Sequence, residues 1–283
     1  MPGILWLASY PKSGNTWLRA FLANYLQNSR APVPIDALPE YIFSDSGAPH
    51  FAKAAGRPVD HMSFEEIQAL RPKVQEMFAL SSSDTAFVKT HGALSIHHDI
   101  PTITPEFTAG AIYVIRNPLD VAVSYAHHYG TSYDHTVDAM AAEDRVRLPE
   151  GDHVHVYLGS WSSHVRSWTL APGLKRHIMR YEDMTLRPEK TWRALIKFLD
   201  LPLETPRLKR AIKFSSFKVL ANQEKEGGFV EAVPIGNRIF FRKGKTGGWR
   251  KELNADQVKR LIEDHGEVMA EHGYLNDKGE PRF

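Results

Sequence analysis

The sequence predicts an α/β fold, a single domain whose central, mostly parallel β-sheet is flanked by helices. Short apolar runs of strand length alternate with longer segments of helical periodicity, an alternation typical of a parallel sheet. The run 111–115 is almost continuously apolar, as expected for a strand buried on both faces. Another run, 4–8, leads through a short polar loop into a helical pattern, the layout of a phosphate-binding unit. No composition break marks a boundary, so 1–283 is predicted to be one domain.

Composition narrows the classes of function. The chain has 283 residues, and its net charge of +2 gives no reason to expect a nucleic-acid partner. It contains no cysteine, which excludes disulfides, thiolate metal sites and a cysteine nucleophile. The N-terminus enters the first strand without a signal-like segment, and no apolar run approaches a membrane span. A cytoplasmic protein without membrane contact is therefore expected.

The first half of the chain begins with the strand 4–8 and a helix whose apolar face carries Leu18 and Phe21. Residues 30–62 are rich in Pro, Gly, Asp and Ser and predict a loop with short helical pieces. Ser63 and Glu66 form a capping-box pattern that opens a helix of about three turns. The next strand is predicted at 85–91.

In the second half, the strand 111–115 ends at a helix start with Asn117 as N-cap and Pro118 in the first turn. Residues 130–158 predict a polar, mobile excursion, and the glycine-enriched segment 222–248 predicts a long flexible loop. A further strand, which runs out into its loop, is expected within 177–183. The remaining helices are predicted at 160–170, 188–199, 206–213 and 255–272.

The segment 9–17 has the features of an anion cradle. Backbone N–H groups of 13–17 would point at the anion, Lys12 supplies a full positive charge, and Gly14 lets the backbone approach closely. The usual nucleotide loop places its lysine after a second glycine, whereas here the lysine precedes the glycine. The Gly-Lys-Thr at 244–246 is no better match, because Ile239 stands where the first glycine is required.

Three chemically useful side chains follow predicted strands, at the edge where ligands of parallel sheets bind. Lys12 suits a phosphate, although a surface lysine after a turn is the structural alternative. His91, predicted on one side of its strand with Lys89, is the best candidate general base among 14 histidines. Arg116 suits a second phosphate, with pairing to Asp120 as the alternative. No aspartate ends that strand to hold Mg²⁺, which speaks against an ATP-dependent kinase.

The string 10–17, Tyr-Pro-Lys-Ser-Gly-Asn-Thr-Trp, resembles the 5′-phosphosulfate loop of the PAPS-dependent sulfotransferases. Four further segments recur in that family's order: 88–91, Arg116 with a serine eight residues later, 180–184 with 215–217, and 242–249. The resemblance spans about 4–250 and is closer to bacterial soluble members. It implies the catalytic residues His91, Lys12 and Lys89. It also implies a binding site for PAPS and its product 3′,5′-ADP made of Lys12, Ser13, Gly14, Asn15, Thr16, Trp17, Arg116, Ser124, Tyr181, Ser216, Phe217, Arg242, Lys243 and Gly244.

Two regions differ from the family's pattern or carry no signal. The usual dimerisation segment would fall on 250–259, where the motif is not matched, so the oligomeric state stays open. The loops 30–62, 130–158 and 222–240, where an acceptor pocket would be built, match nothing. Adjacent histidines at His127 and His128 lack a third ligand at a recognised spacing, so no metal is predicted.

The resulting hypothesis is a sulfotransferase that moves a sulfuryl group in line from PAPS to a hydroxyl, a phenol or an alcohol, of a small-molecule acceptor. His91 serves as base. A P-loop-like ATP-dependent kinase and a non-catalytic nucleotide-binding module are the alternatives. The presence of both Lys89 and His91 weighs against the module, because a protein that only binds has no need of a base.

Overall fold

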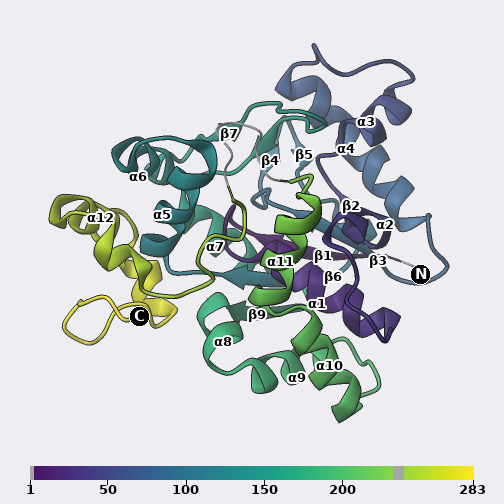
Figure 1. Ribbon diagram of the computed structural model, residues 1–283. Coiled ribbons are helices and arrows are strands. Elements are labelled where there is room, and N and C mark those ends of the chain that lie inside the picture. The colour runs from purple at the N-terminus through teal and green to yellow at the C-terminus, as the bar shows by residue number, and fades with distance from the viewer. Residues whose placement is uncertain (1–2, 232–238) are drawn as a thin grey trace. The chain divides into compact units, whose positions relative to one another are not determined.

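The computed structural model describes residues 3–231 and 239–283 (Figure 1). The chain divides into two compact units. Unit 1 comprises residues up to 10, 42–113 and 139–178, and unit 2 comprises 11–41, 114–138 and 179–283.

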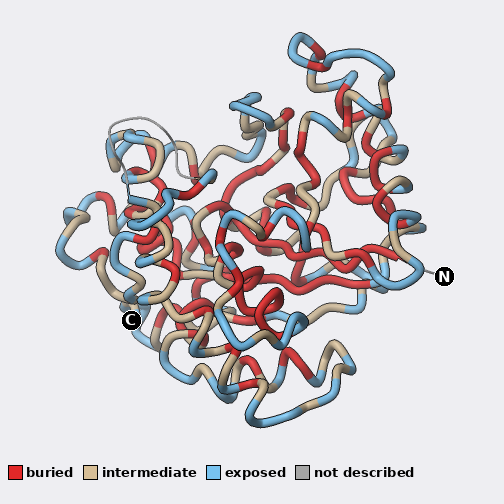
Figure 2. Tube along the Cα trace, turned by 45° about the vertical axis from the view of Figure 1, so that its right-hand side comes forward, coloured by how far each residue is buried: buried red, intermediate tan, exposed pale blue. Residues whose placement is uncertain are grey.

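Unit 1 is built on a five-stranded sheet in the order β2-β3-β1-β6-β9. Its strands are β1 (Ile4–Ser9), β2 (Phe43–Ser44), β3 (Ala86–Thr90), β6 (Thr108–Ile115) and β9 (Arg176–Arg180). The pairs β1–β3 and β2–β3 are parallel, with Ile4 opposite Ala86 and Ala8 opposite Thr90. Every residue of β1 is buried (Figure 2), which explains the continuous apolar run. The predicted α/β fold with its parallel sheet is confirmed, and the carboxyl ends of β1 and β3 lie at one edge.

Helices and two short hairpins complete unit 1. They are α3 (Ala48–Ala55), α4 (Phe64–Ala79), α7 (Trp161–Thr169), η2 (Pro105–Phe107), β4 (Ile96–His97) with β5 (Ile100–Pro101), and β7 (Val146–Arg147) with β8 (Val156–Tyr157). The capping box is confirmed: Ser63 Oγ accepts from the Glu66 N–H at 3.2 Å, and the Glu66 carboxylate accepts from the Ser63 N–H at 2.8 Å. The helix that follows has 16 residues, longer than predicted, and packs on β1 and β3.

The prediction of a polar excursion over 130–158 is wrong. The segment contains α6 (Tyr133–Ala141), β7 and β8. Val137 and Met140 are fully buried one helical turn apart, and Val154, Val156 and Leu158 are buried with the period of two that a strand requires. These apolar residues were outnumbered by the polar residues around them, which hid both patterns.

Unit 2 is mainly helical. It holds α1 (Asn15–Gln27), η1 (Ile35–Ala37), α2 (Leu38–Tyr41), α5 (Pro118–Tyr129), α8 (Tyr181–Leu186), α9 (Pro188–Phe198), α10 (Thr205–Phe214), α11 (Phe217–Gly227), η3 (Gly248–Lys251) and α12 (Ala255–Glu271). Helix α10 packs against α1 and α9. Phe21 of α1 stacks on Trp192 of α9 with ring centroids 4.0 Å apart, so aromatic packing joins these helices.

Two boundaries in unit 2 differ from prediction. The strand expected to run out into a loop within 177–183 ends at Arg180, and the helix α8 begins at Tyr181 in place of that loop. The loop predicted over 222–248 begins later, because α11 continues to Gly227; its part 232–238 lies outside the described residues. In the described ranges, 3–231 and 239–283, no helix is long and apolar enough to cross a membrane.

Candidate functional site

The loop between β1 and α1 is shaped by two left-handed residues. Lys12 has φ 65° and Gly14, the N-cap of α1, has φ 106°. Among the described side chains none caps this helix start, and its first turn holds no acidic residue. The first N–H groups of any helix lack intrahelical partners, and the helix dipole makes this end positive. The loop therefore offers an anion a turn of backbone donors beside Lys12.

Buried polar atoms in this loop fit an anionic ligand. Ser13 is 1% exposed, and its Oγ has no hydrogen-bond partner among the described residues. A buried hydroxyl left without a partner is destabilising, typically by about 1–3 kcal/mol. A phosphate or sulfate oxygen would supply the missing acceptor, so the residues present fit such a group.

The glycine of the loop is required by space as well as by backbone angle. A Cβ at Gly14 would lie 2.7 Å from the Tyr181 ring, a distance that real Cβ contacts do not show. Trp17 meets the same ring edge-on with centroids 5.5 Å apart. The structure thus brings together Gly14, Trp17 and Tyr181, which the sequence resemblance placed at one nucleotide.

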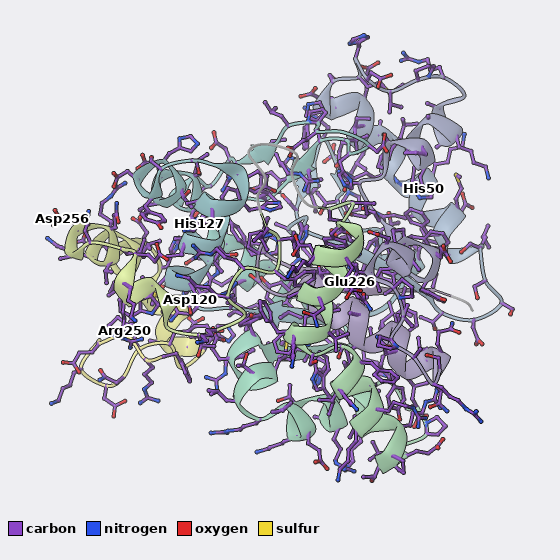
Figure 3. All side chains as sticks on the ribbon, viewed as in Figure 1. His50, Asp120, His127, Glu226, Arg250 and Asp256 are labelled. Carbon is purple, nitrogen blue, oxygen red and sulfur yellow. The ribbon has the colours of Figure 1, made fainter. Side chains whose placement is uncertain are left out.

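Arg116 joins this group from the end of β6. Its guanidinium lies 4.2 Å from the Tyr181 ring centroid, and its Nη1 donates to the Lys12 carbonyl at 2.8 Å. Its buried Nε has no hydrogen-bond partner among the described residues. Asp120, labelled in Figure 3, lies on α5. Its carboxylate accepts from the N–H groups of Gly247 at 2.7 Å and Trp249 at 3.1 Å, so the described contacts do not support the alternative in which Asp120 pairs with Arg116.

Two aromatic side chains, Phe217 and Phe240, contact other residues of the predicted site. Ser216 is the N-cap of α11 and Phe217 its first residue. Gly244, with φ 58°, presses against the Phe217 ring so closely that no Cβ would fit. The Lys12 ammonium lies 3.8 Å from the centroid of Phe240, a contact that the sequence did not indicate. Ser124 lies on α5, half-buried.

The two cations predicted to clamp a phosphate share one carboxylate. Glu252 lies 2.5 Å from Lys243 Nζ and 3.5 Å from Arg242 Nη1, and it accepts from the Tyr133 hydroxyl at 2.7 Å. The hydrogen bond from Lys243, followed by that from Tyr133, lowers the pKa of Glu252 to about 2. Arg242 also contacts the His127 ring. Sequence reasoning missed Glu252, although an acidic residue close behind two basic ones was a visible signal.

In unit 1, the predicted base follows β3 directly. His91 Nδ1 lies 2.9 Å from the Ser9 carbonyl oxygen. A carbonyl oxygen only accepts, so Nδ1 carries a proton and donates it, and in the neutral ring Nε2 holds the lone pair. His91 therefore has the tautomer in which Nε2 can accept a proton. Ser9 is three residues before Lys12 in the chain.

Lys89 lies two residues before the base and is 8% exposed. Its carbonyl accepts from the Asp45 N–H at 3.1 Å, and the Asp45 carboxylate accepts from the Thr90 hydroxyl at 2.6 Å. Burial raises the pKa of Asp45, and the nearby Arg71 opposes that shift. Asp45, which follows the unpredicted edge strand β2, thus fixes β3 just before the base.

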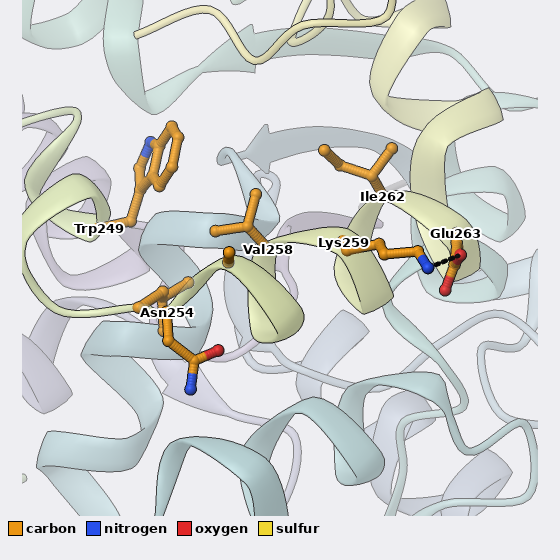
Figure 4. A pocket seen from close by; sticks show the side chains of 8 residues that line it. Trp249, Asn254, Val258, Lys259, Ile262 and Glu263 are labelled. Carbon is orange, nitrogen blue, oxygen red and sulfur yellow. Dashed lines mark ion pairs between the residues drawn. The ribbon is translucent and has the colours of Figure 1, made fainter.

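A groove of about 530 Å³ lies on α12 and contains none of the predicted site residues (Figure 4). Its lining includes Trp249, Leu253, Val258 and Ile262, and an ion pair of 3.6 Å joins Lys259 and Glu263. In the described parts of the chain, no group of three or more metal-ligating side chains is placed to hold a metal ion.

Comparison with known proteins identifies the class. The model of the sulfotransferase domain family matches residues 2–273, so the chain belongs to the sulfotransferase family. It is 27% identical to Sulfotransferase 1A1 of Canis lupus familiaris, over 95% of this chain and 84% of that protein. It is 26% identical to Flavonol 3-sulfotransferase of Flaveria bidentis, over 92% and 80%. Cytosolic sulfotransferase 1 of Arabidopsis thaliana is 24% identical, over 90% and 75%.

Solved structures show the same fold. Mouse sulfotransferase SULT7A1 in complex with PAP superposes with a TM-score of 0.60 at 20% identity, over 96% of this chain and 89% of that one. Retinol dehydratase in complex with androsterone and the inactive cofactor PAP gives a TM-score of 0.65 at 19% identity, over 95% and 81%. The recognition of the family from its loop and four ordered segments is confirmed, and the kinase alternative is not favoured.

Proposed function

We propose that this sulfotransferase uses PAPS as donor, transfers its sulfuryl group to a hydroxyl of a small-molecule acceptor and releases 3′,5′-ADP. The observation that carries this proposal is the loop 12–17. Among the described residues, the buried Ser13 hydroxyl has no hydrogen-bond partner and no side chain caps the positive start of α1. PAPS, when bound, supplies the sulfuryl group and a leaving phosphate that is readily stabilised by cations.

Unit 2 holds every residue proposed to bind the nucleotide. Lys12 and the loop N–H groups of 13–17 would hold the 5′-phosphosulfate. Arg116, with Ser124 and 242–244, would hold the 3′-phosphate, since a guanidinium fork and further cations suit a phosphate. Trp17, Tyr181, Ser216 and Phe217 would surround the purine. The contacts of Arg116 with Lys12 and Tyr181 support this arrangement.

His91 is the proposed general base. Its Nε2 takes the acceptor's hydroxyl proton while the acceptor oxygen forms a bond to sulfur and the bond from sulfur to the 5′-phosphate oxygen breaks. The Nδ1–H···O=C bond to Ser9 supports this role, because it fixes the tautomer that leaves Nε2 open to a proton. Lys12 and Lys89 would stabilise the negative charge that develops on the transferring and leaving groups.

Relatives support a hydroxylated small-molecule acceptor. One is named for a flavonol, and retinol dehydratase has been solved with retinol and with androsterone. We propose a phenol or alcohol acceptor, a cytoplasmic location as in the relative named Cytosolic sulfotransferase 1, and one sulfotransferase domain formed by both units. The family match, which runs through 2–273, supports the last point.

Thermal stabilisation by 3′,5′-ADP, 5′-AMP and ATP–Mg²⁺, measured side by side, tests the donor. We expect a clear rise in Tm with 3′,5′-ADP and a small one with 5′-AMP, because only the former carries the 3′-phosphate. Arg116→Met should reduce the difference between the Tm rise caused by 3′,5′-ADP and the Tm rise caused by 5′-AMP. Arg193→Met, which removes a half-buried arginine paired with Glu189 on α9, is the matched control and should leave this difference in Tm rise unchanged.

Stabilisation by ATP–Mg²⁺ without stabilisation by 3′,5′-ADP would contradict the proposal. So would failure of the wild-type protein to transfer sulfate from PAPS to any of a panel of phenols and alcohols.

A further inference from the structure

His164 is a wholly buried histidine that touches the backbone of the proposed base. It lies on α7 of unit 1 and has no exposed surface. Its Nε2 is 2.9 Å from the His91 carbonyl oxygen, and its Nδ1 is 2.9 Å from the Tyr113 hydroxyl on β6. The Tyr10 ring meets it edge-on at 5.3 Å between centroids. The proposed function gives this side chain no role.

The partners of His164 leave it one protonation state. The His91 carbonyl only accepts, so Nε2 must carry a proton and donate it. Nδ1 of the neutral ring is then an acceptor, which the Tyr113 hydroxyl satisfies. Burial lowers the pKa of His164 to about 4, and burial raises the pKa of Tyr113 well above its usual value. Both groups therefore stay neutral at physiological pH, and the chain Tyr113–His164–His91 has a fixed direction.

Helix α7 holds the chain after β3 at more than one point. The strand ends at Thr90, so 91–94 have no strand ladder to fix them. One turn after His164, Trp168 Nε1 donates to the Gly92 carbonyl at 2.9 Å, and Ser167 Oγ accepts from the Leu94 N–H at 3.1 Å. Side chains at 164, 167 and 168 share one face of the helix. This face of α7 therefore holds 91–94 together with Tyr157, whose carbonyl accepts from the Ala93 N–H at 3.0 Å.

We propose that His164 is a positioning residue for sulfuryl transfer: by binding the His91 carbonyl, it keeps the His91 ring on the Ser9 carbonyl and so keeps its proton on Nδ1 rather than on Nε2. The inference rests on the proposed role of His91. Trp168 and Ser167 still hold Gly92 and Leu94 when the bond from His164 is absent, but the His91 carbonyl loses its donor. The peptide plane at His91 can then tilt, which lengthens the bond from its ring to the Ser9 carbonyl and lets the other tautomer become populated. Small displacements of a base have large effects on rate.

Two variants at this position separate positioning from packing. His164→Gln keeps an amide N–H of similar reach for the His91 carbonyl, whereas His164→Phe keeps a flat ring without a donor. We expect His164→Phe to lower kcat on the order of 10- to 100-fold with KM for PAPS changed less than about twofold. His164→Gln should recover most of the loss. Tyr25→Phe, which removes the buried phenol that donates to the Pro202 carbonyl in unit 2, is the control and should leave kcat unchanged.

Histidine ¹⁵N NMR provides a readout that needs no activity. His91→Asn identifies the His91 signals, which should show the Nδ1–H tautomer in the wild type and in His164→Gln, and a mixture in His164→Phe. If His164→Phe fails to fold, Tyr113→Phe serves in its place, with a smaller shift in the same direction. Unchanged kcat and unchanged His91 signals in a folded His164→Phe variant would overturn the proposal. An inactive wild-type protein whose His91 signals still respond to His164 would overturn the proposed function and leave the positioning role standing.

Discussion

The segment 91–94 contains the proposed base and the segment 242–244 contains the proposed phosphate-binding cations, and the two segments are held in opposite ways. Around His91 the contacts are buried, neutral hydrogen bonds with fixed donors and acceptors. Around Arg242 and Lys243 they are ion pairs to one carboxylate, and the Lys243 side chain is 47% exposed.

The difference follows from what each group has to do. A base must stand at one place in one tautomer, and buried hydrogen bonds provide this because breaking one leaves an unsatisfied group. A phosphate-binding cation must exchange its partner when the ligand arrives, and exposed ion pairs allow this because each is worth only about 0–1 kcal/mol. Glu252 therefore pairs with both proposed phosphate-binding cations near the surface, where salt and an arriving anion compete with the pairs.

Removing the base should have the largest effect. His91→Asn should lower kcat by about 10²–10⁴-fold, the usual contribution of general base catalysis. Stabilisation by 3′,5′-ADP should remain, since the proposed nucleotide residues are in unit 2. Steady-state kinetics and thermal melts measure the two effects, and His61→Asn, an exposed histidine of unit 1, is the control. A His91→Asn variant that keeps the wild-type kcat would show that His91 is not the general base.

The buried His164 should make the free energy of unfolding depend on pH. Burial lowers the pKa of His164 from 6.5 to about 4, so between these pH values the unfolded protein binds a proton at this histidine and the native protein does not. The stabilisation is therefore complete above about pH 6.5 and lost as the pH falls toward 4, by about 3 kcal/mol at about 1.4 kcal/mol per pKa unit.

Urea unfolding of the wild type and of His164→Gln, each across this pH interval, isolates that contribution from other titrating groups. The free energy of unfolding of the variant should fall less steeply with acidification. Parallel curves for the two proteins would contradict the assignment of a neutral His164.

The loop before α1 depends on glycine more than an ordinary turn does. Gly14→Ala combines a left-handed backbone with a clash against Tyr181, so we expect destabilisation of about 1–3 kcal/mol and weaker binding of 3′,5′-ADP. Gly56→Ala is a matched control, because Gly56 has φ 70° with open space around its Cβ position. Equal losses of Tm in the two variants would show that the contact with Tyr181 has no effect.

A substitution beside the proposed phosphate-binding cations Arg242 and Lys243 should have the smallest effect, and this effect should be a gain in nucleotide affinity rather than a loss. Glu252→Gln removes the competing carboxylate, so 3′,5′-ADP should bind up to about fivefold more tightly at low salt, the scale of an exposed ion pair. The advantage should shrink as salt is added. Calorimetric titration measures it, with Glu263→Gln, which loses an exposed pair with Lys259, as control. Weaker binding by Glu252→Gln would mean that Glu252 aligns the cations rather than competing for them.

Local patterns predicted much of the fold. The apolar runs gave β1, β3 and β6, and the pairs Ser63 with Glu66 and Asn117 with Pro118 gave the starts of α4 and α5. The sequence did not reveal β2, which has only two residues and pairs with β3 far along the chain. It did not reveal α6 and β8 either, since their few buried residues stand among polar ones.

The sequence by itself determined the family, the loop 12–17 and the candidate base, because each depends on residues close together in the chain or in a recognisable order. The tertiary structure alone decided the states of these groups. His164, 73 positions from His91 in the chain, binds the His91 carbonyl, and Ser9, 82 positions away, fixes the His91 tautomer. In the C-terminal segment, Glu252 pairs with Lys243 and the Asp120 carboxylate accepts from the Gly247 N–H. A hydrogen-bond direction depends on which atoms meet in space, and a pKa depends on how far water is excluded.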